Sequence, residues 1–231
     1  MNLAEIPGRN RVIVERVTPE LDGGRFFIKA VPQEIIHVEA DVFCDGHDKT
    51  AARLRYKHES EKKWSEVPMR FLNNDRWEGH FAVEKEGFYY YTIEAWVDHL
   101  ASWEHEITLK IRDAQHVNSE LLVGASLLEK IVKHASKEDK KAIQETIKTF
   151  RNEKKYNEAV LLAISEQFSE WIEKYPDQEN VTKYQELKIW VDRPRAEFST
   201  WYSMFPRSAA KEPGKHGTFL DVIDLLPRIQ R

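Results

Sequence analysis

The hydrophobic period of this 231-residue chain changes twice along its length, and this change limits the folds it can adopt. Apolar and polar residues alternate within residues 9–112. Apolar residues then recur every three or four positions from Val117 to Tyr175, and alternation returns at 187–191. Alternation is typical of half-buried strands, and the longer period is typical of amphipathic helices. The pattern predicts a β-domain with a helical block inserted into it.

The alternating region consists of short segments with one polar face, which indicates antiparallel sheets that are wetted on one side. These segments are 52–57, 77–84, 89–97 and 103–111; the last presents Trp103, Ile107, Leu109 and Ile111. Turn-forming residues separate the runs at 22–24, 45–46 and 73–75. We therefore expect a mainly β fold, an immunoglobulin- or fibronectin-like antiparallel β-sandwich over 9–112 and 187–195.

The block at 113–186 is expected to be an inserted helical bundle of three helices, with a short fourth helix before Tyr184 left open. Ser136 is a suitable N-cap, with Asp139 three residues later, and Pro176 ends the third helix. A long insertion costs little, because the entropy of loop closure rises slowly with loop length.

The segment 196–231 has the pattern of one strand followed by one helix. AEFSTWYSMFPRS, at 196–208, is an aromatic strand candidate, and Phe219, Val222, Ile223 and Leu226 fall at helical spacing. Strands of this kind lie in parallel sheets that further helices cover. The segment therefore predicts that the chain is the front part of a larger protein.

These segments resemble a known family. VDRPRAEFSTWYSMFPRS followed by HGTFLDVIDLLPRI is similar to the start of the catalytic barrel in the α-1,4-glucan:maltose-1-phosphate maltosyltransferases, which belong to the α-amylase superfamily. The resemblance extends to GRNRVIVERVTPELDGGRFFIKA, ADVFCDGHD, NDRWEGHF and YTIEAWVDHLASWEHE, and so covers about the whole chain. Ser203-Met204 departs from the family, which usually has an acidic and a large apolar residue there.

The resemblance implies an N-terminal sandwich with a helical insertion, followed at 196–231 by the first strand and helix of a (β/α)8 barrel. It also implies a homodimer, with maltose 1-phosphate and α-1,4-glucan as substrates of the full-length protein. The family's catalytic carboxylates lie on later barrel strands, so no catalytic residue is assigned and the chain alone is expected to be inactive. The residues expected to contact the rest of the barrel are Trp201, Tyr202, Phe205, Phe219, Val222 and Leu226.

The composition of the chain limits which partners it can bind and in which compartment it is expected. The net charge is −4, which gives no global basic field for nucleic acid or an anionic membrane. Cys44 is the only cysteine, which fits a reducing compartment. The N-terminus has no apolar signal segment, and no apolar run approaches a membrane span. We expect a cytoplasmic protein.

No cofactor or metal site is predicted. His99 and His105 lack the Cys and carboxylate grouping typical of zinc, and Asp45 and Asp48 of the DGHD loop are more typical of a turn than of calcium. The pair Gly23-Gly24 does not open a helix, so a phosphate loop is not expected. Cys44 fits a small buried side chain.

The aromatic residues leave two functions open. Many lie on predicted strands: Trp64, Trp77, Tyr89, Tyr90, Tyr91, Trp96 and Trp103. They could stack against sugar rings, which would make the sandwich a glycan-binding module. The favoured interpretation is a core and a domain interface, with Trp190 as the best interface aromatic. The primary hypothesis is therefore a non-catalytic region that supports the barrel and dimerises. A free-standing interaction protein is disfavoured by the unpaired strand at 196–208.

Overall fold

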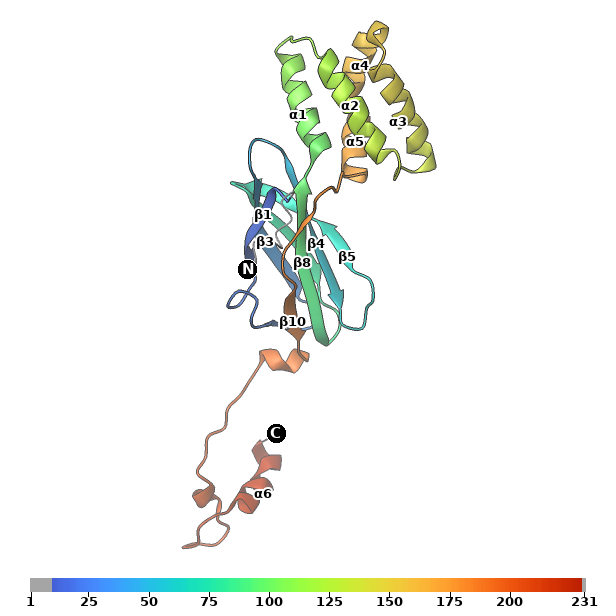
Figure 1. The fold of residues 1–231 in the computed structure, drawn as a ribbon. Helices are drawn as coiled ribbons and strands as arrows, with labels where there is room; N and C mark the ends of the chain where they lie inside the picture. Colours follow the sequence, from blue (N-terminus) through green and yellow to red (C-terminus); the bar gives the residue numbers. More distant parts are fainter. Residues whose placement is uncertain (1–9, 230–231) are drawn as a thin grey trace. The chain divides into compact units, whose positions relative to one another are not determined.

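The structure, a computed structural model, describes residues 10–229. Residue 9 of the predicted β-domain, and residues 230–231 of the predicted barrel segment, lie outside the described residues. The chain divides into two compact units, Met1–Asp192 and Arg193–Arg231. The first unit contains two sheets and five helices, which are drawn in Figure 1.

Two sheets form the β part of the first unit. The four-stranded sheet has the order β1 (Val12–Thr18), β3 (Ile35–Cys44), β7 (Arg76–Ala82), β6 (Arg70–Asn73). The six-stranded sheet has the order β2 (Ile28–Ala30), β10 (Leu187–Val191), β8 (Gly87–Val97), β4 (Thr50–His58), β5 (Ser65–Pro68), and β9 (Thr182–Lys183) also pairs with β8. The prediction of purely antiparallel sheets is wrong at one pair, because β10 runs parallel to β2.

Alternating side chains of the two sheets meet in one core. In β3, Ile36, Val38, Ala40 and Val42 are buried, whereas His37 between them is exposed. Buried residues of β4 and β8, such as Leu54 and Ile93, belong to the same cluster. A shared core between two sheets is consistent with the predicted sandwich.

The predicted turn at 73–75 forms the hairpin between β6 and β7. Asn74 and Asp75 both have positive φ, at 43° and 64°. Two consecutive positive φ angles match the right-handed twist of a hairpin, and Asn and Asp tolerate this conformation better than other side chains. The predicted turn at 22–24 likewise has positive φ at Asp22, Gly23 and Gly24.

Five helices follow β8 before the chain returns to the sheet. They are α1 (His99–Arg112), α2 (Asn118–Ile131), α3 (Lys137–Phe150), α4 (Tyr156–Ala163) and α5 (Glu166–Lys174), with a 3₁₀ turn at Glu153–Lys155. Their apolar faces enclose a second core, separate from that of the sheets. Ser136 caps α3 as predicted, since its side chain accepts a hydrogen bond from the Asp139 amide. None of the described helices is long and apolar enough to cross a bilayer.

The predicted strand at 103–111 is wrong: these residues belong to α1, so the helical region begins at His99 rather than at 113. Trp103, Ile107 and Ile111 are four residues apart, which satisfies a helical period as well as alternation. Asp98 favours the helix over the strand. Its side chain is the N-cap of α1 and accepts a hydrogen bond from the Ala101 amide.

The predicted third helix is two helices. Its apolar pattern runs on from Tyr156 to Tyr175, but α4 ends at Ala163 and α5 begins at Glu166. Between them, the Ser165 side chain accepts a hydrogen bond from the Phe168 amide. A serine that caps the following turn competes with continuation of the preceding helix.

In the second unit, the predicted helix is confirmed and the predicted strand is not. Helix α6 spans Phe219–Ile229. Within 196–208 the described chain has no strand; 3₁₀ turns cover Pro194–Glu197 and Pro206–Ala209, with irregular backbone between them. A β-strand requires a partner strand for its backbone hydrogen bonds, and this segment pairs with none of the described strands.

Candidate functional site

Arg11 forms ion pairs with both aspartates of the DGHD loop. Arg11 Nε lies 2.7 Å from Asp45 Oδ1, and Arg11 Nη1 lies 2.8 Å from Asp48 Oδ2. Cys44, the last residue of β3, is half-buried, and burial raises the pKa of its thiol. The loop is therefore a surface turn whose two carboxylates are both paired with Arg11.

The two histidines singled out on sequence grounds are not brought together. Both lie on α1, and His105 is exposed. His99 instead lies beside Asp177 and Glu179, which follow α5. Neither carboxylate was singled out, because 78 residues separate Asp177 from His99 in the sequence.

The aromatic residues on the predicted strands are mostly internal. Tyr89, Tyr91, Trp96 and Trp103 are buried, and Trp64, Trp77 and Tyr90 are half-buried. Trp190 is also half-buried and packs edge-on against Phe88, with 4.8 Å between ring centroids. The chain itself thus covers the rings that an open sugar platform would need to expose.

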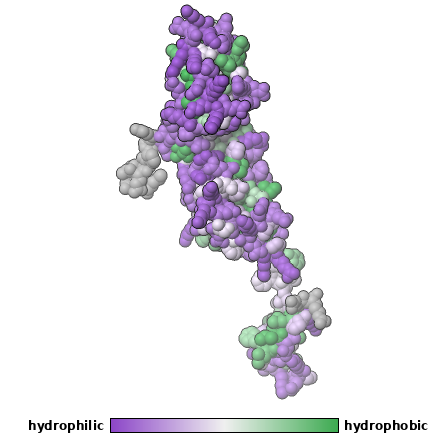
Figure 2. All heavy atoms as spheres, turned by 90° about the vertical axis from the view of Figure 1, so that its right-hand side faces the viewer, coloured by the Kyte–Doolittle hydropathy of each residue, from purple (hydrophilic) through white to green (hydrophobic). Residues whose placement is uncertain are grey.

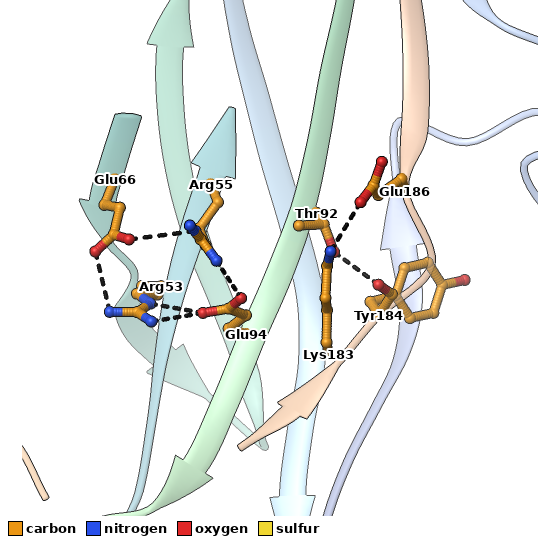
Figure 3. Close-up of polar contacts among 8 residues, drawn as sticks. All are labelled: Arg53, Arg55, Glu66, Thr92, Glu94, Lys183, Tyr184 and Glu186. Atoms are coloured by element: carbon orange, nitrogen blue, oxygen red, sulfur yellow. Dashed lines mark hydrogen bonds and ion pairs between the residues drawn. The ribbon is translucent and has the colours of Figure 1, made fainter. Parts of the chain in front are cut away.

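The six-stranded sheet carries a charged network on the face that points away from the core (Figure 3). Arg53 Nη2 lies 2.6 Å from Glu94 Oε2, and Arg55 Nη1 lies 2.5 Å from Glu94 Oε1. Glu66, on β5, accepts a hydrogen bond from Arg53 Nη1 at 3.0 Å and forms an ion pair with Arg55 Nε at 3.2 Å. Burial raises the pKa of Glu94, but the hydrogen bonds from Arg53 and Arg55 outweigh burial and leave that pKa below its ordinary value.

Sequence reasoning missed this network, although a signal exists. Arg53 and Arg55 alternate on β4, and Glu94 is the residue paired with Arg53 on β8. Opposite charges on paired strands stabilise a sheet. Because the network is closed, with two guanidinium groups between two carboxylates, it fits a structural role better than catalysis.

A groove lies between the sheets and the helices of the first unit, with a volume of about 960 Å³. Trp77 and Trp96 line it together with acidic side chains that include Glu66 and Glu104. The indole nitrogens of both tryptophans are buried and have no hydrogen-bond partner among the described residues. Aromatic rings beside carboxylates are chemically suited to a polar, hydroxylated ligand.

The second unit exposes the side chains that were predicted to contact a barrel. Trp201 is 92% exposed and Phe205 is 81% exposed, and Tyr202, Phe219 and Leu226 are also exposed, while Val222 is half-buried. Figure 2 shows hydrophobic atoms gathered on this unit. Large apolar side chains exposed together mark a surface that another surface covers.

Comparison with known proteins matches residues 10–193 to the N/S domain of α-1,4-glucan:maltose-1-phosphate maltosyltransferase. A maltosyltransferase of that name from Chlorobaculum tepidum is 41% identical over 225 residues, covering 97% of this chain and 33% of the relative. One from Myxococcus xanthus is 39% identical over 229 residues, covering 95% of this chain and 34% of the relative. The chain thus spans about a third of the length of these relatives.

Proposed function

Because the chain belongs to the α-1,4-glucan:maltose-1-phosphate maltosyltransferase family through its N/S domain, we propose that it is a non-catalytic region of such an enzyme. The whole protein would transfer maltosyl units from maltose 1-phosphate to α-1,4-glucan in the cytoplasm. This region would support the catalytic barrel and contribute to a homodimer.

The observation that carries the proposal is the exposed apolar surface within residues 196–229. Trp201, Phe205 and Phe219 have little cover within their own unit. In the proposal, residues 196–231 open the barrel, and its later strands and helices cover these side chains. Retaining glycoside chemistry uses two carboxylates about 5–5.5 Å apart across the scissile bond. We assign that pair to the barrel, and none of its members to this chain.

A chimera tests this function. The N-terminal third of the Chlorobaculum tepidum relative would be replaced by this chain, and phosphate release from maltose 1-phosphate would be measured with a glucan acceptor. We expect the chimera to retain activity, because this chain is 41% identical to the segment that it replaces. A loss of up to about tenfold, which corresponds to ~1.4 kcal/mol, would still agree with the proposal. The relative without its N-terminal third, and this chain alone, should both be inactive.

A matched pair of variants in the chimera locates the contact surface. Phe219→Asp places a charge on the apolar surface. The variant should therefore be insoluble or inactive. Glu212→Gln, at an exposed position of the same unit, should have no effect. A folded chimera that is inactive, or one that tolerates Phe219→Asp, contradicts the proposal. A chimera that is monomeric in light scattering contradicts the dimer.

The groove lined by Trp77 and Trp96 favours a second candidate function, glycan binding. If the tryptophans serve mainly as core and interface, calorimetric titration of the chain with maltoheptaose should show no dissociation constant tighter than about 1 mM, or ~−4 kcal/mol. A micromolar constant that is lost in Trp77→Ala, but kept when Trp190, which does not line the groove, is replaced by Ala, would make glycan binding the better proposal.

A further inference from the structure

The helical region is joined to the sheets by two connections, and three potential metal ligands meet where these connections lie. The first connection runs from β8, which ends at Val97, into α1, whose first residue is His99. The second runs from α5, which ends at Lys174, to β9 at Thr182, and it contains Asp177 and Glu179. One ligand atom from each of His99, Asp177 and Glu179 lies within 4.8 Å of the other two.

Asp177 holds a buried carboxylate oxygen in this cluster. Its side chain is 7% exposed, and Oδ2 has no hydrogen-bond partner among the described residues. Leaving a buried carboxylate oxygen without a donor costs free energy, and such a group gains from a bound cation. The group at Oδ2 in the structure is the Lys130 ammonium, which lies 3.7 Å away and is closer to Glu179, at 3.1 Å.

Within the cluster itself, two carboxylates face one ammonium group. Asp177 and Glu179 share the single ammonium of Lys130. A cavity of about 590 Å³ reaches Asp177 and Glu179, and Lys130, Lys133, His134 and Lys174 also line it.

We propose that His99, Asp177 and Glu179 bind a divalent transition-metal ion of the Zn²⁺ class, which fastens the two connections together. An imidazole with two carboxylates suits Zn²⁺ better than Mg²⁺ or Ca²⁺, which prefer oxygen ligands alone. Zn²⁺ bonds of about 2.0–2.2 Å bring tetrahedral ligand atoms to ~3.4 Å from one another. Rotation of the exposed Glu179 side chain and departure of Lys130 allow that approach.

Metal titration of the untagged, chelator-treated chain tests the site. Competition with a zinc-binding dye should give one Zn²⁺ per chain with a micromolar dissociation constant, and the melting temperature should rise with Zn²⁺. His99→Ala should weaken binding at least tenfold and abolish the rise in melting temperature. His105→Ala removes an exposed histidine from the same helix and should change neither quantity.

Lys130→Met separates the metal site from a simple ion pair. If Lys130 competes with the metal, this variant should bind Zn²⁺ more tightly than the parent chain, and Zn²⁺ should restore the stability that the lost ion pair removes. Co²⁺ binding should give visible absorption bands that disappear in His99→Ala. Circular dichroism checks that each variant is folded.

Three outcomes overturn the proposal. The first is the absence of saturable Zn²⁺ binding below about 100 μM. The second is binding that His99→Ala leaves intact, and the third is equal affinity for Ca²⁺ or Mg²⁺. Any of these would leave the cluster as an ion-pair network centred on Lys130.

Discussion

Replacing Gly124 with Ala is expected to destabilise the helical region by about 2 kcal/mol, although the same change in most helices is stabilising by ~1 kcal/mol. A Cβ atom on Gly124 would lie 2.3 Å from Trp103 Cζ2 and 2.6 Å from Trp103 Cε2. The Trp103 ring is held by Phe168, 5.0 Å away between centroids, and its indole nitrogen donates to the Glu120 carbonyl oxygen at 2.7 Å. The ring therefore cannot move aside without losing contacts and a hydrogen bond.

Urea unfolding, followed by far-ultraviolet circular dichroism, measures this effect. Ser126→Ala, at an exposed position of α2, is the matched control and should change the free energy of unfolding by less than about 0.5 kcal/mol. Combining Gly124→Ala with Trp103→Phe should recover part of the loss, because the smaller ring frees space. A higher urea midpoint for Gly124→Ala would mean that α1 and α2 lie farther apart than in the structure.

This contact illustrates what the sequence could and could not provide. Helix α2 was predictable from Leu121, Ala125 and Leu128, which recur at helical spacing and are buried. The need for glycine at 124 was not predictable, because it depends on a ring from another helix. A glycine inside a helical pattern indicates a close approach but does not identify what approaches.

The error at 103–111 has a different physical origin. Residues four apart satisfy both an alternating and a helical period, so Trp103, Ile107 and Ile111 could not distinguish the two. Leu109 was the residue that carried the strand interpretation, and it is partly exposed on α1. The decisive residue is Asp98, whose capping role follows from its backbone position rather than from hydrophobicity.

At 196–208 a local preference for strand is not sufficient to form one. Aromatic residues such as Trp201 and Phe205 favour strands because they pack on pleated surfaces beside other strands. In the structure these side chains have little around them, and the backbone stays irregular. The proposed barrel would supply the neighbouring strand that the described chain lacks.

The candidate sites were the least predictable part. Arg53, Arg55 and Glu94 alternate on their strands, so a charged face could be inferred, but the pairing of β4 with β8 decides which charges meet. His99 and Asp177 come together only because the helical region leaves and rejoins the sheets at one end. Contacts of this kind depend on topology, which periodicity alone does not determine.

Glu94→Gln is expected to lower the free energy of unfolding by about 2–3 kcal/mol at neutral pH, somewhat less than the loss of a fully buried ion pair. The Glu94 side chain is 8% exposed and accepts hydrogen bonds from both Arg53 and Arg55. Glutamine keeps the shape, but it offers one oxygen and no charge to two guanidinium groups. Glu66→Gln is the control, because Glu66 contacts the same arginines from a side chain that is 43% exposed. Glu66→Gln should lower the free energy of unfolding by less than ~1 kcal/mol.

The same comparison has a defined pH dependence. Because the folded pKa of Glu94 lies below its ordinary value, ionised Glu94 stabilises the fold above the pKa that it has in the unfolded chain. That contribution is lost as the pH falls through the lowered folded pKa. The gap in urea midpoint between the parent chain and Glu94→Gln should therefore be full at pH 7 and should narrow on acidification below about pH 4.5. A gap that stays constant down to pH 3 would assign the loss to packing rather than to the charge of Glu94.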